Sequence, residues 1–263
     1  MSVTHQETPP HVPTIAEQQA FWNEWDRKYR EDRPLDHESA RRRDTVLDSI
    51  RQLRLTNPAI LEVGCANGWL SSSLAQFGQV VGLDLAEDVV QIAAARYPHI
   101  QFIAGDFLTT KLAQTFDIVV SLEALAFFPD QPAFIARLAE VLRPGGHLVL
   151  TTHNKFVYDR RMDVAPLAPG QYRHWTTRAE LRRLLSTRFR ILDLRTIAPA
   201  NGRGVLRLAS SYKVNATLNR LIGREKTEAL KERIGLGTTF VVLAQVRPFA
   251  AAPGQSTRHT EVR

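Results

Sequence analysis

A glycine-containing loop that follows a short apolar run is the part of the sequence best suited to hold a ligand. Residues 59–63 are mostly apolar, and the loop at 64–68 (Gly-Cys-Ala-Asn-Gly) comes directly after them. Glycine lets a backbone turn sharply and approach a ligand closely. Asp84 ends the next apolar run, where a carboxylate can accept both hydroxyls of a ribose. The pattern predicts a nucleoside site, with an ordinary strand-to-helix turn as the alternative.

The spacing of the glycines separates two nucleoside ligands. A dinucleotide such as NAD needs the pattern G-x-G-x-x-G, so that its pyrophosphate lies at the N-terminus of a helix. Here Ala66 takes the second glycine position and Trp69 the third. Glu62 adds a negative charge beside the loop, which opposes a pyrophosphate and suits a ligand with an amino group and a sulfonium. The loop therefore favours S-adenosylmethionine (SAM) over NAD and disfavours a NAD-dependent oxidoreductase.

From about Val46 to Val246, the chain resembles the class I SAM-dependent methyltransferases, whose fold is Rossmann-like. The loop matches the family's E/D-x-G-x-G-x-G motif except at Ala66, and Asp84 matches its ribose-binding acid. Three further motifs follow in the family's order: Gly105-Asp106-Phe107, Phe116-Asp117-Ile118-Val119 and Leu142-Arg143-Pro144-Gly145-Gly146. The resemblance implies SAM as the cofactor, with Asp106 at the adenine amino group and Phe107 beside the ring. The loop pattern is similar to that of quinone and other small-molecule O-methyltransferases.

The resemblance also implies a set of cofactor-binding residues at the ends of the first four strands. They are Glu62, Gly64, Cys65, Ala66, Asn67, Gly68, Asp84, Leu85, Asp106, Phe107, Ser121 and Glu123. Asp106 has a second interpretation as a helix N-cap, and Phe107 as a plain core residue. We interpret Cys65 as a bystander in the loop, because no histidine that could activate it lies nearby in the sequence.

Methyl transfer to a hydroxyl often needs a base at the rim of the site, usually a histidine or a carboxylate. His153, which follows the fifth predicted strand, and His174, which precedes a predicted helix, are the candidates. For both, a structural or surface histidine is the alternative. In many relatives a Glu-His pair lies in the loop after the fourth strand, but here Ala126 and Phe127 take those positions. We therefore expect neither a base on that loop nor a bound metal.

Alternating strand and helix patterns predict the fold. Apolar runs typical of strands lie at 59–63, 80–83, 100–104, 116–121, 147–151, 189–197 and 239–246, and helical patterns between them end near residues 74, 97, 142 and 186. We expect an α/β fold with a seven-stranded, mostly parallel sheet covered by helices on both faces. The resemblance adds that the last strand is antiparallel. Ligands of such sheets bind at the carboxyl ends of the strands.

Five segments follow from these patterns. We expect a disordered arm at 1–14, a helical extension at 15–44, the methyltransferase domain at 45–248 with a helical insertion at about 198–237, and a disordered tail at 249–263. Phe21, Trp22, Trp25 and Tyr29 recur at helical spacing in the extension, which predicts a lid over the cofactor or plain packing. The insertion combines apolar residues at helical spacing with several basic residues. We expect it to pack on its own domain or to cover a hydrophobic or anionic acceptor, including one at a membrane surface.

Composition limits the other functions. The formal net charge of +7 fits a nucleic-acid partner, an anionic membrane or an arginine-rich enzyme, but no nucleic-acid-binding motif is present. Methyl transfer to a small-molecule hydroxyl is therefore preferred over RNA or protein methylation and over non-catalytic SAM binding. The single cysteine rules out an internal disulfide. The first ten residues lack a signal-peptide pattern, and no apolar run reaches about 18 residues, so we expect a cytoplasmic protein.

Overall fold

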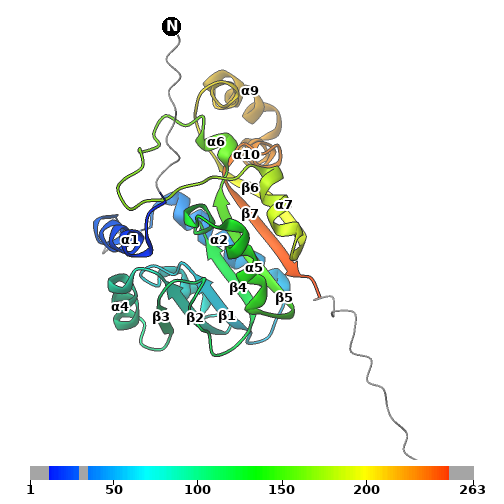
Figure 1. Ribbon diagram of the computed structural model, residues 1–263. Coiled ribbons are helices and arrows are strands. Elements are labelled where there is room, and N and C mark those ends of the chain that lie inside the picture. Colours follow the sequence, from blue (N-terminus) through cyan, green and yellow to red (C-terminus); the bar gives the residue numbers. More distant parts are fainter. Residues whose placement is uncertain (1–11, 30–34, 249–263) are drawn as a thin grey trace, which may run out of the picture.

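The computed structural model describes residues 12–29 and 35–248. The expected tail at 249–263, most of the expected arm at 1–14 and residues 30–34 of the expected helical extension lie outside the described residues. The described residues form one sheet with helices on both of its faces (Figure 1).

The sheet has seven strands in the order β3-β2-β1-β4-β5-β7-β6. β7 runs antiparallel to both of its neighbours, and the other neighbouring pairs are parallel. This confirms the expected fold and puts the change of strand order between β1 and β4. The strands are β1 (Ala59–Val63), β2 (Gln79–Asp84), β3 (Gln101–Ala104), β4 (Phe116–Leu122), β5 (Leu142–His153), β6 (Phe189–Pro199) and β7 (Gly237–Val246).

Helices connect the strands and extend the chain at its start. Asp36 caps α2 by accepting from the amide of Ser39, and Thr177 forms a capping box with Glu180 at the start of α7. No helix among the described residues is long and apolar enough to cross a membrane. The helices are α1 (Ile15–Tyr29), α2 (His37–Leu53), α3 (Trp69–Leu74), α4 (Glu87–Arg96), η1 (a 3-10 turn, Leu125–Phe127), α5 (Gln131–Glu140), α6 (Lys155–Tyr158), α7 (Arg178–Ser186), α8 (Val205–Ala209), α9 (Tyr212–Ile222) and α10 (Arg224–Arg233).

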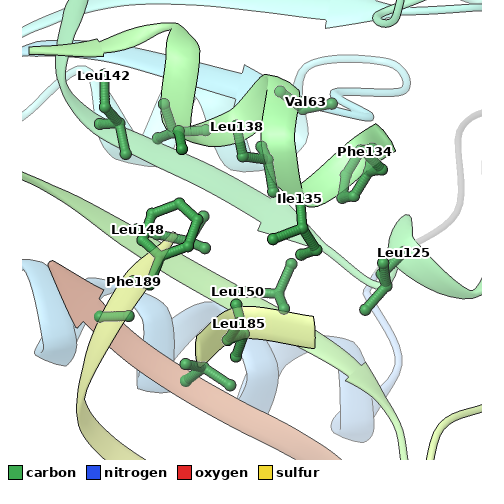
Figure 2. Packing of buried hydrophobic residues seen from close by; sticks show 14 of the residues in the cluster. Val63, Leu125, Phe134, Ile135, Leu138, Leu142, Leu148, Leu150, Leu185 and Phe189 are labelled. Carbon is green, nitrogen blue, oxygen red and sulfur yellow. The ribbon is translucent and has the colours of Figure 1, made fainter. Parts of the chain in front are cut away.

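The core has two layers because side chains alternate between the faces of each strand. On one face, α5 and α7 pack on strand residues such as Leu148 and Leu150, and Figure 2 shows Phe134, Ile135 and Leu138 of α5 in this layer. On the other face, α2 and α3 cover a second cluster. Helices on both faces fix the sheet, so its carboxyl ends form a rigid edge for a site.

The fifth strand is longer than its apolar run predicts. Residues 147–151 were expected to form it, but β5 already starts at Leu142. Leu142 pairs with Phe116, while the next pair joins His147 to Ile118, so residues 143–146 bulge out of the ladder. Arg143 in this bulge donates to both carboxylate oxygens of Asp117 at 2.7 Å. The expected turn is therefore a bulge inside the strand.

Candidate functional site

The loop between β1 and α3 bends tightly around the end of β2. Gly64 and Ala66 have positive φ angles of 81° and 45°, and a Cβ added to Gly64 would lie 3.1 Å from the Cβ of Ala124. The amide of Gly64 donates to the carbonyl of Leu83 at 2.8 Å. The amide of Ala66 donates to Oδ2 of Asp84 at 2.8 Å. This bond stabilises a left-handed alanine where the family motif has glycine.

A cavity of about 470 Å³ lies beside the loop, at the carboxyl ends of β1, β2 and β4. Its volume is within the range of about 300–1,000 Å³ that is usual for small-molecule sites. Helix α1 forms one wall with Trp22 and Trp25. Two members of the aromatic row, Trp22 and Trp25, therefore face the cavity, as a lid would. Trp22 also packs on Phe127, with ring centroids 4.6 Å apart.

The charged groups that line the cavity are mainly acidic. Burial raises the pKa of Glu62 to about 8; the Ser71 hydroxyl opposes this rise and the nearby charge of Asp84 adds to it. Burial also raises the pKa of Asp84, against hydrogen bonds from backbone amides. Carboxylates in this state favour a ligand that brings positive charge. The charged lining residues are Asp26, Glu62, Asp84, Asp106, Glu123, Asp130 and Arg42.

Most of the predicted cofactor-binding residues line this cavity. Those that do are Glu62, Gly64, Ala66, Asp84, Leu85, Asp106, Phe107 and Glu123. Those that do not are Cys65, Asn67, Gly68 and Ser121, although the first three belong to the loop. Cys65 is buried, and its Sγ would be 3.0 Å from a Cβ added to Gly82, so the thiol lies beneath the loop. Ser121 is fully buried within the sheet.

The core interpretation of Phe107 holds together with its place at the cavity, whereas no helix follows Asp106, so this residue is not a helix N-cap. Asp106 accepts from the amide of Leu108 at 3.0 Å, as a turn-forming acid does. Phe107 is buried and contacts Phe134 of α5, with ring centroids 5.5 Å apart. Each residue therefore shapes the local structure and also presents part of its surface to the ligand.

A second charged group, centred on Glu123, lies at the ends of β4 and β5. Oε2 of Glu123 is 3.0 Å from Nδ1 of His153, and Oε1 is 3.8 Å from Nε of Arg42. Burial opposes the charged form of Glu123, but His153 and Arg42 outweigh it and lower its pKa to about 2. The φ angle of Glu123 is 62°, a left-handed conformation that is uncommon for non-glycine residues. Glu123 is thus held as a carboxylate between two basic side chains.

Aromatic rings surround the imidazole of His153. The ring centroids of Tyr158 and Phe127 are 4.7 and 5.9 Å from it, both edge to face. Trp175 stacks at 4.8 Å on Tyr158. Burial raises the pKa of Tyr158, and the charge of Glu123 raises it further. Rings with apolar faces around an imidazole suit a flat, apolar acceptor.

His174 lies differently from His153. Its backbone amide donates to the carbonyl of Ala126 at 2.7 Å, and its carbonyl accepts from Nε2 of Gln131 at 2.9 Å. Its side chain is exposed, whereas that of His153 is largely buried, and neither histidine is among the residues that line the cavity. The backbone of His174 thus connects the segment before α7 to the loop after β4 by hydrogen bonds. Only its side chain is free to interact with a substrate.

Three residues near the site were not singled out from the sequence. For Arg42, helical spacing in the sequence did indicate burial. It lies four residues before Val46 and eight before Ile50, and therefore on the buried face of α2. Tyr158 and Trp175 lie in loop-like segments with no local signal. Their position depends on α6 and on the pairing of Asn154 with Thr176.

Two further expectations concern metals and the insertion. Among the described residues, no group of three or more histidine, cysteine, aspartate or glutamate side chains could hold a metal ion. No residue of the insertion at 198–237 lines the cavity. The insertion packs instead on α6, where Leu206 and Leu236 contact Val157.

Comparisons with known proteins agree with this site. Residues 61–150 match the model of a family described as "Methyltransferase domain". A probable SAM-dependent methyltransferase from Mycolicibacterium smegmatis is 31% identical over 65% of this chain and 66% of its own length. The ubiquinone biosynthesis O-methyltransferase of Coxiella burnetii is 34% identical over 40% of this chain and 47% of its own length. The chain thus spans less than two thirds of either relative.

A solved structure shows the same fold. The N-methyltransferase NodS from Bradyrhizobium japonicum, in complex with S-adenosyl-L-homocysteine (SAH), superposes with a TM-score of 0.59. The match covers 89% of this chain and 99% of NodS at 16% sequence identity. The sequence resemblance relied on the glycine loop and Asp84, which line the cavity in part and lie within the segment that matches the family model. The chain thus contains a segment that matches the methyltransferase-domain family, and it has the fold of the class I SAM-dependent methyltransferases.

Proposed function

We propose that this chain transfers a methyl group from SAM to a hydroxyl oxygen of a small, largely apolar acceptor. In this proposal His153 removes the hydroxyl proton. The observation that carries it is the 3.0 Å contact between Nδ1 of His153 and Oε2 of Glu123, a residue that lines the cofactor cavity. A base must be close to the reacting group and correctly oriented, and a buried carboxylate provides the orientation.

The residues of the cavity fit SAM. Each carboxylate oxygen of Asp84 accepts one backbone amide, which leaves a lone pair on each for a ribose hydroxyl. Glu62 lies beside the loop, where an amino group or sulfonium would offset the unfavourable burial of its charge. SAM supplies an electrophilic methyl group when it is bound. The protein's tasks are then to position the acceptor and to remove its proton.

The contact between His153 and Glu123 decides which imidazole nitrogen can act as the base. Nδ1 faces Glu123, so Nε2 is the atom that can accept a proton from the acceptor. Because Glu123 is ionised, its charge stabilises the imidazolium that forms. Arg42 on the far side of Glu123 keeps the carboxylate charged. Glu123 and Arg42 are thus positioning residues that act through His153.

The acceptor's chemistry follows from what surrounds His153. Phe127 lines the cavity, and the rings of Tyr158 and Trp175 lie beside His153. The charged groups of the cavity are mostly negative. Of the hydrophobic or anionic acceptors expected from the sequence, these surroundings favour the hydrophobic one. The similarity to a ubiquinone biosynthesis O-methyltransferase of Coxiella burnetii supports oxygen as the methylated atom.

The test compares two matched histidine variants. His153→Asn and His174→Asn would be assayed with labelled SAM against a panel of phenols and catechols. We expect His153→Asn to lower turnover by about 10²- to 10⁴-fold with the Kd for SAH unchanged, and His174→Asn to keep near wild-type turnover. Full activity of His153→Asn, or loss confined to His174→Asn, would refute the assignment of the base.

RNA or protein methylation remains the second candidate, and the net charge of +7 is its support. The acid-lined cavity opposes a polyanion near the methyl group. The same labelled assay with total RNA and with a peptide library would decide between them. Binding of SAM without turnover on any acceptor class would instead favour a non-catalytic SAM-binding protein.

A further inference from the structure

The insertion between β6 and β7 stands at the same edge of the sheet as the proposed acceptor site. Pro199 at the end of β6 pairs with Gly237 of β7, and His153 of β5 pairs with Thr239 two residues further along β7. Helices α8, α9 and α10 therefore project from the edge where His153 lies. Figure 1 shows α9 and α10 beside α6, at the end of the molecule away from α4.

Exposed apolar side chains are concentrated on this insertion. Of the sixteen large apolar side chains that are exposed in the described part of the chain, eight lie between residues 205 and 234. Among them, Tyr212 is 87% exposed, Leu221 74% and Leu208 67%. Single exposed apolar residues are normal, but a cluster of this kind marks an interaction surface.

Helix α9 turns its apolar row away from the domain. Its residues form three neighbouring stripes at helical spacing. The side-chain oxygens of Asn215 and Asn219 are buried, so the amide-bearing stripe faces inward. No residue of α9 is buried, and Val214 and Leu221 of the middle stripe are exposed. The stripes are Lys213, Thr217 and Arg220; Val214, Leu218 and Leu221; and Asn215, Asn219 and Ile222.

Positive charge borders the apolar row. Residues 205–234 contain seven basic and three acidic side chains. Two of the acids are already paired, Glu228 with Lys231 at 2.8 Å and Glu232 with Arg41 of α2. The exposed basic residues for which no ion pair is found within the described chain are Arg207, Lys213, Arg220, Arg224, Lys226 and Arg233.

We propose that α9 and the flanking parts of α8 and α10 dock on the surface of an anionic lipid bilayer. An apolar row with basic side chains along its border is the pattern that interfacial helices use, in which the apolar residues enter the headgroup region and the cations meet lipid phosphates. A second copy of the chain is a poorer occupant. A two-fold contact would bring the same basic residues of both copies together, and like charges across an interface are unfavourable.

This docking would bring the proposed acceptor site close to the bilayer. Leu206 of α8 and Leu236 pack on Val157 of α6, and Nδ2 of Asn154 donates to the carbonyls of Gly235 and Gly237 at 3.0 and 2.8 Å. The insertion is thus joined to the segment that follows His153. The orientation would suit an acceptor dissolved in the membrane; this part rests on the proposed function, whereas the docking does not.

The test is sedimentation of the full chain with vesicles, without SAM or acceptor. We expect binding to vesicles of phosphatidylcholine with about one third phosphatidylglycerol, little binding to phosphatidylcholine alone, and loss of binding as salt rises from about 0.1 to about 1 M. Because each cation at an anionic surface strengthens binding about fivefold, Lys213→Gln/Arg220→Gln should weaken it about 25-fold. The matched control Arg182→Gln/Arg183→Gln removes two exposed arginines from α7 and should bind like the wild type.

A second pair of variants tests the apolar row. Leu221→Asp should weaken vesicle binding at least about tenfold, whereas Leu55→Asp, at an exposed leucine before β1, should not. Circular dichroism melts of all variants would verify folding. Failure of the wild type to sediment with anionic vesicles would overturn the proposal. So would light scattering that shows a wild-type dimer and a Leu221→Asp monomer, because a second copy would then cover the row. The vesicle assay measures no turnover, so its failure would leave the proposed methyl transfer untouched.

Discussion

Replacing Glu62 with glutamine should stabilise the ligand-free protein, and the gain should grow with pH. Glu62 is buried at the end of β1, and burial raises its pKa to about 8 from an ordinary value of 4.5. Between these values the folded state retains a proton that the unfolded chain releases. The free energy of unfolding then falls by about 1.4 kcal/mol per pH unit. Relative to pH 4.5, the titration of Glu62 therefore lowers the free energy of unfolding of the wild type by about 3 kcal/mol at pH 7 and by about 5 kcal/mol above pH 8.

The sign follows from the acid's raised pKa. The stability contribution of Glu62 is fully present below pH 4.5, where both states are protonated, and is lost as the pH rises toward 8. Glutamine does not titrate, so Glu62→Gln escapes this loss. The hydroxyl of Ser71, which donates to Oε2 of Glu62, can donate to the glutamine oxygen instead. An unpaired glutamine amide would subtract about 1–3 kcal/mol at every pH, so the pH dependence is the diagnostic quantity.

The assay is urea unfolding of the wild type and Glu62→Gln at pH 5, 6, 7 and 8, followed by tryptophan fluorescence. The difference in unfolding free energy should change by about 3–4 kcal/mol in favour of the variant between pH 5 and pH 8. The control Glu225→Gln, at an exposed glutamate of α10, should show no such change. A difference that stays constant with pH, or that grows in favour of the wild type, would refute the claim that Glu62 is buried without a compensating cation.

Three further results are expected. SAM binding at pH 7 should release protons from Glu62, so the heat of binding should depend on the ionisation enthalpy of the buffer. Glu62→Gln should abolish this dependence; an equal proton release by the variant would contradict the prediction. Asp84→Ala should weaken SAH binding by about 1–3 kcal/mol, or about 5- to 150-fold. The ribose would lose the carboxylate that accepts its hydroxyls, and the amide of Ala66 would lose its acceptor. Unchanged affinity in calorimetry would exclude Asp84 from the site. Methyl transfer should survive a chelator, and loss of turnover that magnesium or zinc restores would show a metal requirement.

The cofactor end of the site could be predicted because its signals are local. A strand, a glycine loop and an acid at the end of the next strand lie within 59–84, and parallel pairing of β1 with β2 brings them together. The same local signals also predicted contacts for Cys65 and Ser121. Their side chains lie under the loop and inside the sheet and do not line the cavity.

The acceptor end could not be predicted to the same degree because its contacts are distant in sequence. Glu123 meets Arg42 and His153 only after α2 has packed on the face of the sheet and β5 has paired with β4. The sequence names His153 and His174 as equals, and the proposed function prefers His153 because of its contact with Glu123. The insertion was expected as one amphipathic segment, whereas three helices form, and α9 presents amides rather than leucines to the domain.

Glu62 and Glu123 show how one residue type acquires two states in one cavity. Both are buried, and burial alone would raise the pKa of each. Glu62 has a hydroxyl and another carboxylate as neighbours, so its pKa rises to about 8 until a cationic ligand arrives. Glu123 has His153 and Arg42, so its pKa stays at about 2 and it can stabilise an imidazolium. Arg42 comes from the helical extension, and without it the carboxylate would move toward the state of Glu62. The extension therefore contributes to the chemistry of the acceptor end as well as to the wall of the cavity.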